Sequence, residues 1–164
     1  MEEKIQGKTV WKFGDNFNAD LIVGSKYIAE SNAEVLGEVC LRDFDPEFAK
    51  RVQPGDVMIA GKNFGYGHPH QQGIVSLKKV GVAALVAESF YPLWYRMAIF
   101  YAFPIVICPG ITQNVNPDDL LEIEFSTGNI VNVTTRQKMK AEPVPTFLME
   151  VLQSGGLIKH LQKK

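Results

Sequence analysis

The sequence predicts a mixed α/β fold, in which a parallel α/β centre is joined to antiparallel hairpin strands. In the middle of the chain, apolar strand-like runs alternate with helix-like segments, as expected for parallel strands with crossover helices. The last third alternates apolar and polar residues on both sides of a short turn, which is typical of a β-hairpin. No linker-like stretch divides the 164 residues, so we expect one domain over residues 1–164.

The first third is predicted to contain one strand and two short helices. Residues 9–13 alternate apolar and polar side chains and lead into a polar loop at 14–20. A helix is expected from Ser31, as its cap, to about residue 39. Asp45-Pro46 predicts a second helix start, with a cap followed by a proline in the first turn.

The centre of the chain carries the parallel unit. The predicted order is strand, helix, strand, helix, strand, at residues 57–60, 70–80, 82–87, 91–102 and 105–108. Ile74, Leu77 and Val80 give the first of these helices an inward face, and Gly81 suits its C-terminus. Leu93, Met97 and Phe100 form a stripe on the second helix.

The last third predicts antiparallel strands and a terminal helix. Strands at 120–125 and 130–133 face each other across a turn, and a further strand is expected near 138–141. A helix starting at about residue 146 is broken at 154–156, and a short basic tail follows it.

Composition excludes several classes of function. The chain carries 17 basic and 18 acidic residues without a basic stripe, which argues against nucleic acid or an anionic membrane as partner. No stretch approaches the roughly 20 apolar residues of a membrane span. The N-terminus is charged and lacks the apolar core of a signal peptide, so we expect a cytoplasmic protein.

The two cysteines, Cys40 and Cys108, lie in apolar segments and are expected to be buried, reduced thiols. Two cysteines cannot supply the three or four thiolates that usually hold an iron–sulfur cluster. We therefore expect no cofactor and no metal in this chain.

The segment Gly61-Lys62-Asn63-Phe64-Gly65-Tyr66-Gly67-His68-Pro69-His70 carries the strongest functional signal, because it lies between a predicted strand and a predicted helix. Glycines allow close approach of a ligand to the backbone, and a helix N-terminus favours a carboxylate or phosphate. Histidines titrate near neutral pH. These features predict an anion-binding turn that carries acid–base groups.

The first seven residues of this segment resemble the opening of the active-site loop in the 3-isopropylmalate dehydratase small-subunit family. Further resemblances follow in the family's order at residues 14–22, 44–48, 87–90, 95–99, 140–145 and 155–158. They cover nearly the whole chain. The resemblance implies an aconitase-like swivelling β/β/α domain and a hydro-lyase of leucine biosynthesis.

The resemblance also implies a partner and a substrate. The partner is a large iron–sulfur subunit, in a heterodimer or heterotetramer, and the substrate is a small hydroxy-diacid of the malate type. The cluster iron of the partner acts in such enzymes as Lewis acid on the leaving hydroxyl group.

The family loop continues Ser-Ser-Arg-Glu-His, with the serine as catalytic base and the arginine as carboxylate clamp. This chain instead has His68 and His70 at those two places, with Pro69 between them. A neutral imidazole can abstract a proton and an imidazolium can pair with a carboxylate, so both are candidate catalytic residues. The same loop contributes Asn63, Gly65 and Gly67 as candidate substrate-binding positions.

Three residues outside this loop complete the candidate site. Lys26 falls where relatives carry a specificity loop with an arginine, which is absent at Ala29. Asp20 is expected either to fix the loop, to orient a histidine or to cap a turn. Arg96 corresponds to a family arginine and is assigned either to the cleft or to a solvated helix face.

Three alternatives remain open on the sequence. The chain is a relative acting on another substituted malate such as dimethylmalate, a non-catalytic swivelling-domain binding module, or an enzyme that binds a metal through His68 and His70. No nearby Cys, Asp or Glu completes such a metal site in sequence. The aromatic stripe at 90–95 is assigned to the core or to a partner interface rather than to a cofactor.

Overall fold

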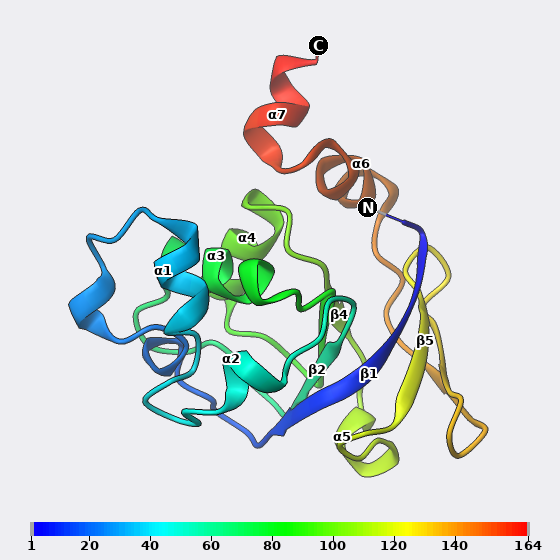
Figure 1. Cartoon of the computed structure of the whole chain (residues 1–164). Helices are drawn as coiled ribbons and strands as arrows, with labels where there is room; N and C mark the ends of the chain where they lie inside the picture. Colours follow the sequence, from blue (N-terminus) through cyan, green and yellow to red (C-terminus); the bar gives the residue numbers. More distant parts are fainter. Residues whose placement is uncertain (1, 164) are drawn as a thin grey trace.

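The computed structural model describes residues 2–163, in which seven strands form one sheet of order β4-β3-β2-β1-β5-β6-β7 (Figure 1). The strands are β1 Lys4–Phe13, β2 Val57–Ala60, β3 Ala84–Ala87, β4 Ile105–Ile107, β5 Leu120–Glu124, β6 Asn129–Asn132 and β7 Gln137–Lys140. The parallel pairing of β2 with β3 and of β3 with β4 confirms the predicted α/β centre. The antiparallel ladder of β5, β6 and β7 confirms the predicted hairpin region.

The helices gather mainly on one side of this sheet. They are α1 Ala33–Glu38, α2 Phe48–Arg51, α3 Gln71–Val80, α4 Pro92–Phe100, α5 Ile111–Asn114, α6 Thr146–Ser154 and α7 Leu157–Gln162. Figure 1 shows α1 to α4 on one side of β1 and the β5–β7 ladder on the other, with α6 and α7 at one end. None of the helices within residues 2–163 has the length and apolar character needed to cross a bilayer.

Strand β1 connects the two halves of the sheet. Its first half pairs antiparallel with β5, from Lys4 opposite Glu124 to Lys8 opposite Leu120. Its second half pairs parallel with β2, and the register ends with Phe13 opposite Ala60. Both β1 and β2 therefore end at the same edge, where the loops that follow them meet. Ligand sites of open α/β sheets form at such carboxyl ends.

Several element boundaries differ from those predicted. The N-cap of α1 is Asn32, whose Oδ1 accepts the Glu34 N–H at 2.9 Å, and not Ser31. Helix α2 begins at Phe48, because the Asp45 side chain first closes a turn by accepting the Glu47 N–H at 3.1 Å. The predicted strand at 82–87 begins only at Ala84.

Helix α4 buries a different stripe from the one predicted. Trp94, Ala98 and Ile99 face the core, whereas Leu93 is 46% exposed. The predicted basic tail is the further helix α7. Gly155 and Gly156 both have positive φ and turn the chain back, and a side chain at Gly156 would collide with the Phe100 carbonyl.

An aromatic cluster lies beneath the glycine-rich loop. Phe64, which is fully buried, stacks on Phe17 with ring centroids 5.4 Å apart and meets Trp94 edge-on at 5.2 Å. Such pairs add to the free energy gained by burying the rings. This arrangement confirms the core assignment for Trp94 and gives the loop a rigid floor.

Gly65 is expected to tolerate no side chain. Its φ of +86° disfavours other residues, and a Cβ there would overlap the Trp94 ring. Gly65→Ala should lower the free energy of unfolding by about 3 kcal/mol, since strain and overpacking add. Gly14→Ala is the matched control, because an added Cβ at Gly14 meets no atom within 4 Å. Denaturant titration measures both, and equal midpoints for the two variants would contradict the assignment.

The two cysteines are free and buried, as predicted. Burial raises the pKa of the Cys40 thiol to about 12 and that of Cys108 to about 11. Both groups therefore stay protonated until the pH rises far above neutral, and at pH 8 only about one Cys40 in 10⁴ is a thiolate. Iodoacetamide at pH 8 should leave the native chain unmodified and label both thiols in denaturant, as intact-mass measurements will show. Rapid native labelling would contradict the burial.

Candidate active-site cleft

The glycine-rich loop begins where β2 ends and leads directly into α3, whose N-cap is His70. His68 and His70 are exposed, and the buried Pro69 between them anchors the loop. Because His70 has extended backbone angles, with φ −120° and ψ 152°, the alternation along the chain turns both imidazoles outward. Gly81 ends the helix in the left-handed conformation, as predicted.

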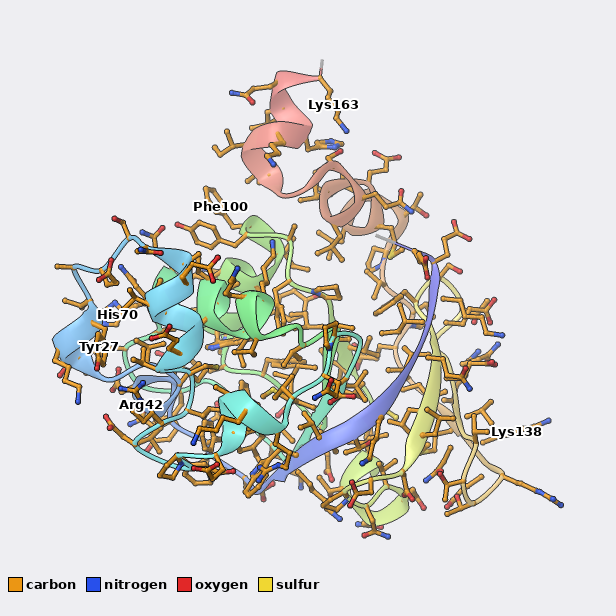
Figure 2. All side chains as sticks on the ribbon, in the orientation of Figure 1. Tyr27, Arg42, His70, Phe100, Lys138 and Lys163 are labelled. Carbon is orange, nitrogen blue, oxygen red and sulfur yellow. The ribbon has the colours of Figure 1, made fainter. Side chains whose placement is uncertain are left out.

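The two histidines line a cleft of about 450 Å³ together with residues from distant parts of the sequence. The lining residues are Asp20, Gly24, Ser25, Lys26, Asp43, His68 and His70. In Figure 2, His70 and Tyr27 lie at the same edge of the molecule, far from Lys138 on the β-ladder. The structure thus brings together four residues that the sequence singled out: Asp20, Lys26, His68 and His70.

Asp20 lies beside His68, with its Oδ2 atom 3.5 Å from Nδ1 of the imidazole. Two hydrogen bonds fix the backbone of the turn that carries Asp20: the Asn18 side chain accepts the Asp20 N–H at 2.8 Å, and the Ala19 N–H donates to the Tyr66 carbonyl at 2.8 Å. The turn containing Asp20 is therefore tied to the loop containing His68.

Gly67 allows this close approach. Its φ is +95°, and a Cβ there would overlap the Asn18 side chain and lie 3.2 Å from the Asp20 carboxylate. The role that the structure gives Gly67 is therefore to admit the Asp20 turn. At 86% exposure, His68 keeps the rest of its ring open to the cleft.

Lys26 lies on the other wall, in the 3-10 turn Ser25–Tyr27. Its ammonium nitrogen is 3.9 Å from Asp43 and lies over the Tyr27 ring, 5.2 Å from the centroid. Sequence reasoning missed Asp43, because its position depends on a distant backbone contact, in which the Leu41 N–H donates to the Ile22 carbonyl at 2.8 Å. No local motif marks that contact.

The charges of the cleft nearly balance. Among the described residues that line it, Lys26 is the only permanent cation, and the two carboxylates of Asp20 and Asp43 oppose it. With neutral imidazoles the residues that line the cleft carry a net charge of −1, and protonation of both histidines changes this net charge to +1. A dianionic ligand would thus gain little Coulomb attraction from these residues alone while the histidines are neutral.

The remaining candidate residues of the loop support its shape. Asn63, with φ +55°, donates its N–H to the Ser89 hydroxyl at 2.8 Å and its side-chain amide to Asn16 at 2.9 Å. Gly65 faces Trp94 rather than the cleft. Both residues hold the loop on the protein body, and neither lines the cleft.

Two further residues, Gln72 and Arg96, lie outside the lining of the cleft. Gln72 is buried and donates its amide to the Ile28 carbonyl at 2.5 Å, which connects α3 to the loop after Lys26. Arg96 is exposed on α4 and lines a separate apolar hollow with Phe147 and Leu148 of α6. The structure therefore does not bring Arg96 to the histidines.

Within the described residues, no group of three or more His, Cys, Asp or Glu side chains is placed to hold a metal ion. The buried, protonated thiols of Cys40 and Cys108 do not reach the cleft either. The residues of this chain consequently do not fit the ligand set of an iron–sulfur cluster.

Comparison with known proteins shows what the chain is similar to. It is 40% identical to the isopropylmalate/citramalate isomerase small subunit of Methanocaldococcus jannaschii over 164 residues, which is 100% of this chain and 97% of that protein. It is 36% identical to the 3-isopropylmalate dehydratase small subunit of Halothermothrix orenii, covering 97% of this chain and 96% of the relative. No family model matches the sequence.

The crystal structure of 3-isopropylmalate dehydratase from Methanocaldococcus jannaschii superposes with a TM-score of 0.90 at 31% identity. The match covers 98% of this chain and 94% of that one, and it confirms the predicted fold class. Since the similarity in sequence and in structure spans nearly the whole length of both proteins, the chain belongs to the 3-isopropylmalate dehydratase small-subunit family.

Proposed function

We propose that this chain is the small subunit of an aconitase-type hydro-lyase, which dehydrates or isomerises a malate-like hydroxy-diacid together with a large iron–sulfur subunit. The observation that carries the proposal is the cleft itself. Its two histidines lie on the loop by which the family is recognised, and a lysine and the carboxylate beside His68 come from the segment that follows β1, near the carboxyl ends of β1 and β2. The full-length similarity to small subunits supports the same assignment.

His68 is the proposed general base. Asp20 contacts Nδ1, so a proton on that nitrogen leaves Nε2 free to accept the proton next to a substrate carboxylate. Asp20 is a positioning residue in this scheme, since it acts through the imidazole and holds one tautomer.

His70 and Lys26 are the proposed carboxylate partners. His70 lies at the N-cap of α3 and makes no side-chain capping bond there, so the first turn of a ten-residue helix faces the same ligand. Besides lying over the Tyr27 ring, the Lys26 ammonium has a long contact to Asp43, which a substrate carboxylate can replace.

The partner supplies what this chain lacks. The charge balance of the cleft gives a dianion little attraction, so the proposal requires a second wall with positive charge or a metal. A cluster on the large subunit would supply a Lewis acid for the hydroxyl group, and this chain would supply the base and the carboxylate contacts. We further propose leucine biosynthesis as the pathway and the cytoplasm as the compartment, as the family resemblance of the sequence implies.

This proposal does not specify which alkyl group the substrate carries. The relative in Methanocaldococcus jannaschii is named for both isopropylmalate and citramalate, whose substituents differ in size. Turnover of a series of 3-alkylmalates by the reconstituted enzyme ranks these substrates.

The first test addresses His68. Mixed with its large subunit, wild-type chain should give hydratase activity that neither subunit shows alone, and His68→Ala should lower kcat by about 10²- to 10⁴-fold, because the proton acceptor is lost. Lys62→Ala is the control, since Lys62 is an exposed residue of the same loop outside the cleft lining. Full activity of His68→Ala would exclude His68 as the base.

The second test separates the two carboxylates. Asp20→Asn should lower kcat by about two- to fivefold with little change in KM, because an exposed pair orients His68 only weakly. Asp43→Asn should change KM instead, since it releases Lys26 for the substrate. Steady-state kinetics of both variants decide the matter, and an unchanged kcat for Asp20→Asn would contradict the positioning role.

A further inference from the structure

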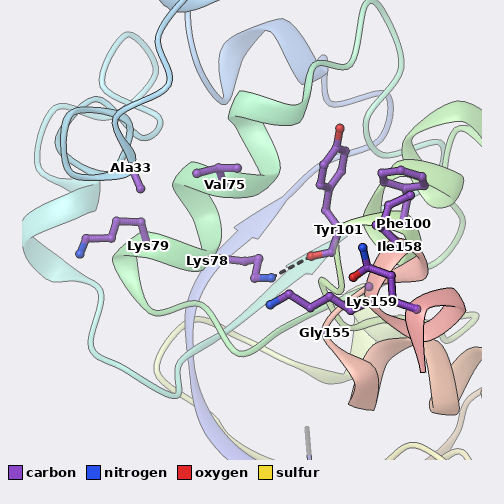
Figure 3. A pocket seen from close by; sticks show the side chains of 11 residues that line it. Ala33, Val75, Lys78, Lys79, Phe100, Tyr101, Gly155, Ile158 and Lys159 are labelled. Carbon is purple, nitrogen blue, oxygen red and sulfur yellow. Dashed lines mark hydrogen bonds between the residues drawn. The ribbon is translucent and has the colours of Figure 1, made fainter.

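A second hollow lies at the opposite end of α3 from the histidines. It has a volume of about 630 Å³ and opens between the second half of α3, the C-terminal end of α4 and the start of α7 (Figure 3). This size falls in the range of small-molecule sites, which are mostly apolar and carry a few polar groups. The hollow has one wall with polar, cationic groups and another wall that is apolar.

One wall is cationic. The Lys78 ammonium donates a hydrogen bond to the Tyr101 carbonyl at 2.7 Å, which holds it at the rim. Figure 3 shows the side chains of Lys78 and Lys159 extending toward the same space, while Lys79 points away. Lys79 is paired with Glu34, but no ion pair joins Lys78 or Lys159 to an acid in the described part of the chain.

The ammonium groups of Lys78 and Lys159 repel each other. Burial, together with the positive charge of Lys159, lowers the pKa of Lys78. A like-charge pair without an acid is unfavourable, and an anion placed between the two groups would remove the repulsion. The wall therefore favours an anionic group.

The other wall is apolar. Val75 of α3, Phe100 of α4 and Ile158 of α7 form it, and Ile158 is 52% exposed although it is a large aliphatic residue. These three side chains come from three helices and line the same hollow as the ammonium groups. An apolar surface of this kind suits a hydrocarbon chain better than a sugar or a nucleotide base, whose polar groups it would leave unpaired.

We propose that this hollow binds a small organic acid with a branched apolar chain. Its carboxylate lies between Lys78 and Lys159, and its hydrocarbon part covers Val75, Phe100 and Ile158. Helix α7 provides Ile158 and Lys159, and α3 provides Val75 and Lys78. The bound acid therefore joins α7 to α3, the helix whose N-cap is His70.

The test is a calorimetric titration of the purified chain with 4-methylpentanoate at low ionic strength. We expect a dissociation constant of about 1 mM or tighter. The neutral isostere 4-methylpentanamide, which keeps the shape and lacks the charge, should bind at least tenfold more weakly. Acetate, which keeps the charge and lacks the chain, should also bind at least tenfold more weakly.

Two charge-reversal variants on the same helix sharpen the test. Lys159→Glu should weaken binding of 4-methylpentanoate at least tenfold, because it turns attraction into repulsion. Lys163→Glu is the matched control, because Lys163 is an exposed residue near the end of α7 outside the hollow, and it should change binding less than twofold.

Four results would overturn the proposal, of which the first three come from the titrations. These three are no heat of binding up to 10 mM acid, equal affinities for the acid and its amide, and equal effects of the two variants. A concentration-dependent dimer that Lys159→Glu dissociates would also overturn it, since a second copy of the chain would then fill the hollow. Sedimentation velocity of wild type and variant detects that case.

Discussion

The double pairing of β1 is the constraint on which the rest of the structure depends. One ten-residue strand is antiparallel to β5 in its first half and parallel to β2 in its second half, and it thereby joins a hairpin ladder to an α/β unit. Since the parallel half ends at Phe13 opposite Ala60, the loops after both strands start side by side. The Asp20 turn and the His68 loop meet for this reason, and Gly67 then permits their contact.

The sequence predicted those parts of the fold that local patterns specify. The strand at 57–60, the helix ending at Gly81 and the hairpin at β5 and β6 follow from periodicity and turn residues, and all were confirmed. The caps were harder, because neighbouring Ser31 and Asn32 offer the same chemistry and only the backbone geometry chooses between them. Helix α7 was missed because its four apolar or buried positions interleave with polar residues in a segment of only six residues.

The candidate site likewise contains residues that the sequence identified and residues whose position depends on distant contacts. His68 and His70 lie on one loop with a recognisable frame, and the family resemblance pointed to Asp20 and Lys26 on the segment just after β1. Asp43 joins them only through the contact between Leu41 and Ile22, which no spacing reveals. Gly65 and Asn63 were assigned to the ligand, whereas the structure gives them packing and hydrogen-bonding duties against Trp94 and Ser89.

The position of β1 in the sheet also bears on how the chain is made by the ribosome. Its first half stays an unpaired edge until residues 120–124 have been synthesised, more than 100 residues later. Unpaired edges recruit other strands, and distant pairings form slowly. A nascent chain arrested before β5 therefore exposes an unpaired strand edge, so termination before residue 120 yields aggregation-prone fragments rather than a smaller folded protein.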